Sequence, residues 1–308
     1  MSIALEATTA TAVARRQRPL RAVVADYVSL TKPRIIVLLE ITAFCAMLMA
    51  ARGWPGLGLV LVTMAGGALA AGGANTINMW FDRDIDTQMR RTCSRPIPSG
   101  RIEPQHALVF GIALEVASFA LLATFANLLA ATLALSALLF YVLVYTMWLK
   151  RTSMQNIVIG GAAGAMPPLV GWAAVSGHIT VSALFLFAII FYWTPPHFWA
   201  LALLIRRDYE AAHVPMLPVV KGDRETRAQI ALYTVVMVAV TMLPVFTHAL
   251  GWVYLGGAAV LDGIFMAYAL RTYRDSSARS AGRLFHYSLL YLALLFAVAA
   301  LDSVVLAS

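Results

Sequence analysis

Apolar residues gather in nine long runs along the chain, and short polar or charged segments separate the runs. Each run approaches the ~20 residues that a helix needs to cross the hydrocarbon core of a bilayer. The pattern therefore predicts an all-α polytopic membrane protein with nine transmembrane helices. The runs cover about residues 35–51, 57–80, 107–125, 129–149, 155–176, 180–203, 230–250, 252–270 and 285–305.

The composition supports a membrane protein and excludes a soluble domain of this size. Of the 308 residues, 61% are hydrophobic and only 12% are charged, and the mean hydropathy is +0.78. The two cysteines, Cys45 and Cys93, are too few for a disulfide framework or a cysteine metal cluster. The net charge of +8 raises nucleic acid as a partner, but the placement of the basic residues has another explanation.

Basic residues lie almost entirely on one side of the predicted membrane. With the N-terminus in the cytoplasm, every lysine and arginine except Arg52 falls in the first segment or in cytoplasmic loops, as the positive-inside rule requires. The C-terminus is then outside, and the positive charge needs no nucleic acid partner. We expect residues 1–34 to form a disordered basic cytoplasmic tail and residues 35–308 to form a single transmembrane domain.

Two long cytoplasmic loops, residues 82–106 and 206–229, share an order of features. Each follows an even-numbered span and opens with acidic residues. Each then continues through a Pro-x(1–2)-Pro segment to a cluster of glycine, basic and acidic residues. This order predicts two four-helix halves plus a ninth helix, with the equivalent loops facing each other. The alternative is that any cytoplasmic loop is rich in proline, glycine and charge.

Asn78, Asp82 and Asp86 end the second apolar run with a spacing of four residues. If the helix continues, the three side chains lie on one face, because four residues turn only about 40° beyond a full turn. Two carboxylates four residues apart repel each other, so we expect this stripe to bind a cation. Asp84 points roughly the opposite way.

Several arginines follow these carboxylates in the first loop, between positions 90 and 101. Divalent cations on the aspartates and guanidinium groups beside them would together bind a phosphate group. The second loop supplies charged residues that would complete the same site: Arg206, Arg207, Asp208, Glu210, Lys221, Asp223, Arg224 and Arg227. The positive-inside rule explains basic loops, but it does not explain three acidic residues at positions 82, 84 and 86. No P-loop, dinucleotide-binding glycine motif, His-Glu-x-x-His or cysteine pair supports nucleotide hydrolysis or redox chemistry.

The fifth and sixth spans carry residues with more than one explanation. Gly160 and Gly164 allow a helix or a flat ligand to approach closely, and Pro167-Pro168 kinks the fifth span. His197 lies within the sixth span, where a histidine is either a functional residue or a partner for a carbonyl freed by Pro195-Pro196. The third and fourth spans show the weakest chemistry and are predicted to serve packing.

The stripe Asn78-x-x-x-Asp82-x-x-x-Asp86 resembles the first signature of the UbiA superfamily of intramembrane prenyltransferases. Longer strings, between about Tyr27 and Asp302, resemble one branch of it, the protohaem IX farnesyltransferases or haem O synthases. These strings are Asp82-Arg-Asp-Ile-Asp86, Met89-Arg-Arg-Thr92, Arg95-Pro96, Leu149-Lys-Arg-Thr152, Asn156-Ile-Val-Ile-Gly160, Pro195-Pro-His-Phe-Trp199 and Pro215-Met-Leu-Pro-Val219. The resemblance implies a UbiA-like fold in a bacterial inner membrane, with the site at the cytoplasmic face.

The resemblance also implies an activity and a set of site residues. A farnesyl group would pass from farnesyl diphosphate to the vinyl group of haem B, with addition of water, to give haem O and diphosphate. The implied cofactor is Mg²⁺, held by Asn78, Asp82 and Asp86, with Asp208 serving a second metal ion. The residues implied to neutralise the diphosphate are Arg91, Arg95, Lys150, Arg151 and Lys221.

For the haem, the resemblance implies contacts from His197 and Trp199. The aromatic faces of Tyr192, Trp193 and Phe198 would help to stabilise a farnesyl cation or stack on the porphyrin. Haem A synthase or assembly factors of terminal oxidases are the implied protein partners.

The chain departs from the superfamily at its second motif. Asp208 is followed four residues later by Ala212 instead of a second aspartate, so Glu210 or Asp223 would have to substitute. His213 stands where this branch is expected to carry glycine. Two other functions stay open: a prenyltransferase that acts on an aromatic ring in a quinone pathway, and a haem or lipid carrier without enzymatic activity.

Overall fold

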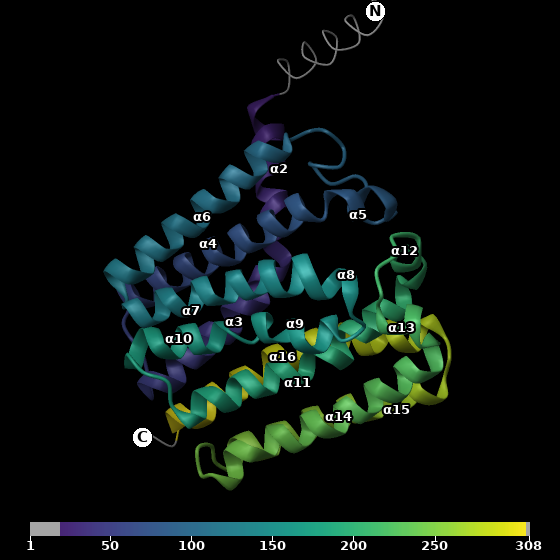
Figure 1. The fold of residues 1–308 in the computed structure, drawn as a ribbon. Helices are drawn as coiled ribbons and strands as arrows, with labels where there is room; N and C mark the ends of the chain where they lie inside the picture. Colours follow the sequence, from purple (N-terminus) through teal and green to yellow (C-terminus); the bar gives the residue numbers. More distant parts are fainter. Residues whose placement is uncertain (1–18, 306–308) are drawn as a thin grey trace, which may run out of the picture.

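The protein is described here by a computed structural model that covers residues 19–305, and every regular element in that range is a helix (Figure 1). Nine helical spans within these residues are long and apolar enough to cross a membrane, which confirms the predicted architecture. They are Pro33–Ala51 (α3), Leu57–Phe81 (α4), Pro104–Phe125 (α6), Leu128–Thr152 (α7 Leu128–Leu139, η1 Phe140–Leu149 and α8 Lys150–Thr152), Asn156–Ser176 (α9 Asn156–Gly164 and α10 Pro167–Ser176), Val181–Leu204 (α11), Gly222–Phe246 (α14), Trp252–Arg274 (α15) and Ala278–Val305 (α16).

Two spans begin earlier than their apolar runs suggest. The seventh begins at Gly222 and the ninth at Ala278, whereas the apolar runs begin near 230 and 285. The reason is that polar and charged residues form the first turns of both helices, and apolar content alone does not mark such turns.

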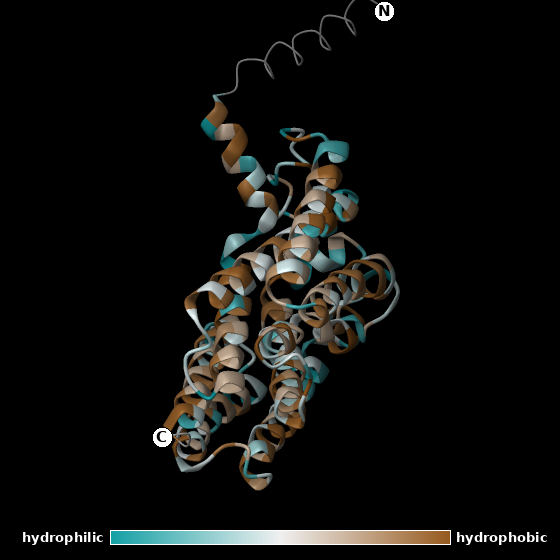
Figure 2. Cartoon of the chain, turned by 90° about the vertical axis from the view of Figure 1, so that its left-hand side faces the viewer, coloured by the Kyte–Doolittle hydropathy of each residue, from teal (hydrophilic) through white to brown (hydrophobic). Residues whose placement is uncertain are grey.

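Within each half, the spans pack against their neighbours in chain order. α4 lies against α6 and α6 against α7, while α11 lies against α14, α14 against α15 and α15 against α16. α3 contacts both α10 and α16, so it joins the two halves. Hydrophobic residues run along most of the helices (Figure 2), and many large ones are exposed on the outside of the bundle, including Phe246 at 78% and Trp252 at 84%. Such an outer surface fits the predicted lipid environment.

The two long loops contain short helices and lie at the same end of the bundle, at the right of Figure 1. The first loop contains α5 (Arg83–Gln88), and the second contains α12 (Arg206–Ala211) and α13 (Leu217–Val220). α13 leads directly into α14, so the second loop is shorter than the sequence suggests.

Leu20–Thr31 form a helix, α2, in the segment where the sequence predicts a disordered tail. Its buried face carries Asp26 and Leu30, and Leu30 joins an apolar cluster with residues of α4 and the first loop. Arg101 Nε donates to Asp26 Oδ1 at 3.0 Å. The prediction of disorder is therefore wrong for this segment, because tertiary contacts supply the burial that its local composition lacks. The rest of the predicted tail, residues 1–18, lies outside the described residues.

The fifth span is split into α9 and α10, as the prolines at its centre predict. A Cβ at Gly160 would lie 2.3 Å from Cδ2 of Tyr145, so this glycine allows the tyrosine ring to pack against the helix backbone. A Cβ at Gly164 would meet no atom within 4 Å. Packing of side chains between spans is therefore the explanation for Gly160.

Candidate functional site

Asn78, Asp82 and Asp86 lie on one face, as their spacing predicts. α4 gives way to α5 at Asp82, yet the backbone N–H groups of Asp82 and Asp86 still donate to the carbonyl oxygens four residues earlier, at 2.9 and 2.8 Å. Asn78, Asp82 and Asp86 are only 4%, 1% and 2% exposed. The Asp84 side chain, by contrast, is 57% exposed. The buried face therefore carries two carboxylates and one amide.

Cations from two other segments hold the two buried carboxylates. Lys150, at the start of α8, donates from Nζ to Asp82 Oδ2. Arg95, in the first loop, donates from Nη1 to both carboxylate oxygens of Asp86, at 2.9 and 2.7 Å. Each buried carboxylate therefore has a cationic partner within hydrogen-bond distance. Both basic residues were expected near a phosphate group, and the structure places them on the aspartates.

Lys32 is a site residue that the sequence reasoning assigned to the tail. It joins α2 to α3 in a left-handed conformation with φ of 54°, and its Nζ donates to Asn78 Oδ1 at 2.9 Å. Burial lowers the pKa of Lys32 to about 7, and the charge of Arg95 adds to the effect while that of Asp82 opposes it. The only signal in the sequence is its position directly before Pro33, which marks a helix boundary.

The fourth span contributes to the site, so its assignment to packing is wrong. Its last part, η1, is a π-helix, whose wider turn redirects the side chains that follow. Thr146 Oγ1 accepts a hydrogen bond from Asn78 Nδ2 at 3.0 Å and donates to the carbonyl oxygen of Tyr141, five residues earlier. The same amide nitrogen of Asn78 donates to Asp82 Oδ2 at 2.8 Å. An apolar pattern does not reveal such a local change of helix type.

Asp82 Oδ1 is buried and accepts no hydrogen bond; its nearest cationic atom is Arg151 Nη2, at 3.8 Å. Together with the oxygens of Asn78 and Asp86 it forms a set of hard donors of the kind that Mg²⁺ prefers. No group of three or more histidine, cysteine, aspartate or glutamate side chains able to hold a metal by itself occurs among residues 19–305. Since Mg²⁺ is usually bound by one or two carboxylates together with phosphate oxygens, this donor set fits a metal ion that is shared with a phosphate ligand.

The second loop reaches the first loop through α12. The backbone N–H of Arg91 donates to Asp208 Oδ2 at 3.3 Å. Tyr209 is buried beside this contact, and burial raises its pKa to about 12 against the lowering effect of Arg91 and Arg95. This contact confirms the prediction that the two long loops face each other.

The other charged residues of the second loop lie apart from the aspartates. Lys221 is exposed, and no contact with the first loop is found for it in the part of the chain that the structure describes. Asp223 pairs with Arg206 at 3.0 Å and Glu210 is exposed. Arg227 is buried and donates to three carbonyl oxygens at the end of α15 and in the turn after it, so it fastens α14 to α15.

Arg151 pairs with Asp84, on the exposed side of α5. Its two Nη atoms donate to the two carboxylate oxygens at 2.7 and 2.8 Å, and its guanidinium group lies 4.7 Å from the centre of the Phe81 ring. The hydrogen bond from Arg151 lowers the pKa of Asp84 to about 2, against the effect of partial burial. This two-pronged pair ties α8 to α5.

His197 lies between the rings of Trp193 and Phe285, whose centres are 4.2 and 4.9 Å from its own. Its Nδ1 is 2.6 Å from Ser288 Oγ, and that hydroxyl itself donates to the carbonyl oxygen of Phe285. Nδ1 therefore carries the proton, and Nε2 keeps its lone pair. A hydroxyl group of α16 is thus the partner of His197, in place of the expected carbonyl freed by the prolines. Trp199 is 2% exposed, and its Nε1 is buried without a hydrogen-bond partner.

His213 adopts the left-handed conformation, with φ of 53°. Glycine reaches this conformation without steric cost, which explains why glycine is expected at this position. Histidine is one of the side chains that enter this region more readily than most.

Comparison of the sequence with known proteins identifies its relatives. The profile of the UbiA prenyltransferase family matches residues 39–297. A Roseiflexus sp. (strain RS-1) protein named protoheme IX farnesyltransferase is 57% identical over 282 residues, which cover 92% of this chain and 53% of that protein. A protein of the same name from Symbiobacterium thermophilum is 53% identical over 282 residues, which cover 91% of this chain and 94% of that protein. The chain spans about half the length of several of these relatives, including those from Roseiflexus, Chloroflexus and Thermus.

Two solved structures share the arrangement of the helices. A structure described as a digeranylgeranylglyceryl phosphate synthase aligns over 92% of this chain and 99% of that one, with a TM-score of 0.75 and 19% identity. A UbiA homologue from Archaeoglobus fulgidus bound to DMAPP and Mg²⁺ aligns over 89% of this chain and 99% of that one, with a TM-score of 0.63 and 17% identity. At this level of identity the likeness demonstrates a common fold.

Proposed function

Because the chain belongs to the UbiA prenyltransferase family, we propose that it moves a farnesyl group from farnesyl diphosphate to the vinyl group of haem B. The buried stripe of Asn78, Asp82 and Asp86, surrounded by cations at the end of the bundle, carries this proposal. Relatives of 53% to 57% identity that are named protoheme IX farnesyltransferase support haem as the acceptor. The products would be haem O and diphosphate.

The reaction breaks the bond between C1 of the farnesyl group and a diphosphate oxygen, and the electron pair leaves with the diphosphate. The outer vinyl carbon of haem B then bonds to C1. Water adds to the inner vinyl carbon as a hydroxyl group, and its other proton is released. The change is neutral in oxidation state, so it needs no further reactant.

The residues of the stripe would hold Mg²⁺, with Asp208 serving a second ion from the other half. When bound, Mg²⁺ would neutralise negative charge that develops on the departing diphosphate. A homologue with DMAPP and Mg²⁺ bound supports this assignment. The buried Asp82 Oδ1 has no hydrogen-bond partner, so coordination of a metal ion would satisfy an oxygen that is otherwise unpaired.

The basic residues around the stripe would bind the diphosphate itself. Lys150 and Arg95 lie on the carboxylates, and Lys32 lies on the Asn78 amide. Metal binding to those oxygens would free the three cations to donate to phosphate oxygens, where preorganised positive charge favours ionisation. Arg91 would join them from the loop contact with Asp208, and Arg151 would join them from its position 3.8 Å from Asp82 Oδ1. Lys221, which is exposed, would contribute least.

The haem would lie against the aromatic residues of α11. His197 presents an unprotonated Nε2, since its Nδ1–H is fixed by Ser288, and a nitrogen in that state is able to ligate iron. Trp199 offers a buried Nε1–H without a partner, which suits a polar group of the acceptor. Both roles are proposed on these contacts and would be tested by the haem spectra of His197→Ala and Trp199→Phe proteins; unchanged spectra would remove them.

The orientation follows from the basic residues: the N-terminus and the site would be cytoplasmic, and the C-terminus would be outside. In a bacterial inner membrane this would place the diphosphate site at the cytoplasmic face. Haem A synthase or assembly factors of terminal oxidases would receive the product.

Product analysis tests the function directly. Purified protein would be incubated with haem B, farnesyl diphosphate and Mg²⁺, and the haem would be analysed by mass spectrometry. We expect a haem product whose mass has risen by one farnesyl group plus one hydroxyl, and no product after chelation of Mg²⁺. A parallel incubation would replace haem B with 4-hydroxybenzoate. Prenylation of 4-hydroxybenzoate without change to the haem would instead establish an aromatic prenyltransferase, and intact substrates in both incubations would favour a carrier.

A further inference from the structure

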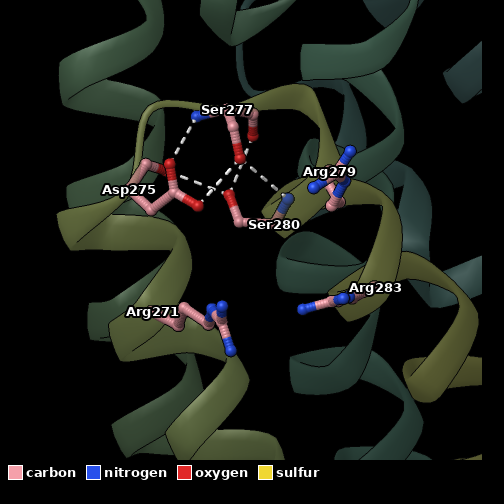
Figure 3. A pocket seen from close by; sticks show the side chains of 6 residues that line it. All are labelled: Arg271, Asp275, Ser277, Arg279, Ser280 and Arg283. Carbon is pink, nitrogen blue, oxygen red and sulfur yellow. Dashed lines mark hydrogen bonds between the residues drawn. The ribbon is translucent and has the colours of Figure 1, made fainter.

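The turn between α15 and α16 forms a basic pocket that is separate from the aspartate site. A cavity of about 530 Å³ opens there, lined by Arg271, Asp275, Ser277, Arg279, Ser280 and Arg283 (Figure 3). Arg271 and Arg283 point toward one another across it (Figure 3). α15 ends and α16 begins at the end of the bundle that also carries the two long loops (Figure 1), so the pocket lies at the same membrane face as the aspartates.

The three arginines of this pocket face a single carboxylate, Asp275, on which the charge of Arg271 acts. No hydrogen bond or ion pair engages the guanidinium groups of Arg271, Arg279 or Arg283 among the residues that the structure describes. The one carboxylate in the lining, Asp275, accepts the backbone N–H of Ser277 at 2.9 Å and its hydroxyl at 2.8 Å. Three positive charges therefore gather in one cavity with a single carboxylate that is already engaged, and such a cavity attracts an anion.

A second cavity continues from the first along the two spans. It has about 620 Å³ and shares two of the arginines, and its lining then changes from basic to aromatic and apolar: Tyr268, Arg279, Gly282, Arg283, His286, Tyr287 and Leu290. Leu290 is 54% exposed, as are Ile264 (40%) and Leu294 (41%) on the same two helices. The basic end and the apolar groove together match a molecule that has an anionic head and a hydrocarbon chain.

We propose that this pocket binds an anionic phospholipid of the surrounding membrane. The phosphate group would lie among Arg271, Arg279 and Arg283, and one acyl chain would follow the groove past Tyr268 and Leu290. Basic pockets between spans at the cytoplasmic face bind phosphate headgroups in this way, and each arginine near such a surface contributes about 1 kcal/mol. The site is independent of the prenyl transfer, because its lining includes none of the residues assigned to that reaction.

The charge requirement would be tested by lipid retention. The protein would be reconstituted in nanodiscs with equal amounts of phosphatidylglycerol and phosphatidylcholine, and the lipids that stay bound would be counted by native mass spectrometry. We expect preferential retention of phosphatidylglycerol, reduced about fivefold by Arg279→Gln or by Arg283→Gln. Arg274→Gln is the matched control, because Arg274 is exposed on the same turn but does not line either cavity. Equal loss in the control, or equal retention of the two lipids, would overturn the proposal.

A second variant tests the groove without any change of charge. Gly282 lines the second cavity, and a Cβ there would meet no atom within 4 Å, so the Cβ of Gly282→Phe is accommodated and its ring is expected to occupy the groove. We expect it to lose phosphatidylglycerol while its melting temperature stays near that of the parent. Unchanged retention in Gly282→Phe, or displacement of the bound lipid by excess inorganic phosphate alone, would show that a free anion and not a lipid occupies the pocket.

Discussion

The two long loops follow the same plan in the sequence but form different structures at the site. In the first, three buried side chains each contact a cation of their own. In the second, Asp208 is half-buried and accepts one hydrogen bond of 3.3 Å from a backbone N–H. The first half therefore holds a preorganised group of charges. Among the described residues, the polar link from Asp208 to that group is one long hydrogen bond, and apolar residues of the two loops share one buried cluster.

The two loops differ at the site because different segments of the chain hold them in place. The first loop is fastened from outside by α2, through Asp26 and Arg101. In the stripe that leads into it, Asn78 donates to Thr146 of the π-helical segment η1, and Asp82 accepts from Lys150 of α8. The second loop merges into α14, and its Arg227 serves the junction between α14 and α15. The first loop thus contributes charged contacts at the candidate site, whereas the second contributes to the packing of the helices. Variants in each loop should reveal this difference.

The largest loss of catalytic rate is expected from a substitution in the first loop. Asp86→Asn should lower the rate of haem farnesylation about a thousandfold, because it removes a metal ligand and leaves Arg95 without its carboxylate. Asp223→Asn, which alters an exposed acid of the second loop, is the matched control and should stay within about threefold of the parent. Comparable rates for the two variants would mean that the two loops contribute equally to catalysis.

For a variant in the second loop, we expect lower stability of the fold with unchanged specific activity. Arg227→Met should destabilise the protein by about 3 kcal/mol, since three carbonyl oxygens, one buried and two partly buried, lose a charged donor. Thermal unfolding in detergent would measure the change, and the folded fraction should keep its specific activity. A rate constant that falls with no change in melting temperature would place Arg227 in the reaction instead.

An intermediate effect is expected for Asp208→Asn. Because the one hydrogen bond of the Asp208 carboxylate found among residues 19–305 is the long one from the Arg91 backbone, the rate should fall about thirtyfold, or roughly 2 kcal/mol. The concentration of Mg²⁺ needed for half-maximal activity should rise in parallel. A loss as large as that of Asp86→Asn would show that the second half is as tightly organised as the first once the substrate is bound.

The smallest kinetic effects are expected from substitutions of two lysines, and their KM values can be compared directly. Lys32→Gln should raise the KM for farnesyl diphosphate about tenfold, because its Nζ lies on the Asn78 amide at the site. Lys221→Gln should change the KM less than twofold, since Lys221 is exposed and away from the aspartates. The reverse order would mean that the second loop moves over the substrate and brings Lys221 into contact.

The sequence predicted the nine spans and the stripe of Asn78, Asp82 and Asp86 because both depend on periodicity along one helix. It did not reveal Lys32 or Thr146, since their positions depend on how separate segments meet. Lys32 is placed by the packing of α2, and Thr146 by a change from α- to π-helix that leaves no trace in the apolar pattern. The diphosphate role of Lys221 stays a prediction, because the structure shows this lysine exposed and a charge in a loop does not specify where the side chain points.

The central claim is that the buried stripe of Asn78, Asp82 and Asp86 promotes the departure of diphosphate, and that exposed acidic residues nearby do not. Asp82 and Asp84 are two residues apart, but Asp82 is 1% exposed on the stripe and Asp84 points outward to Arg151. The most direct test is the initial rate of haem farnesylation by Asp82→Asn and Asp84→Asn proteins at equal folded concentration. We predict that Asp82→Asn is at least about a hundredfold slower than Asp84→Asn. Equal rates for the two variants would contradict the assignment of the stripe.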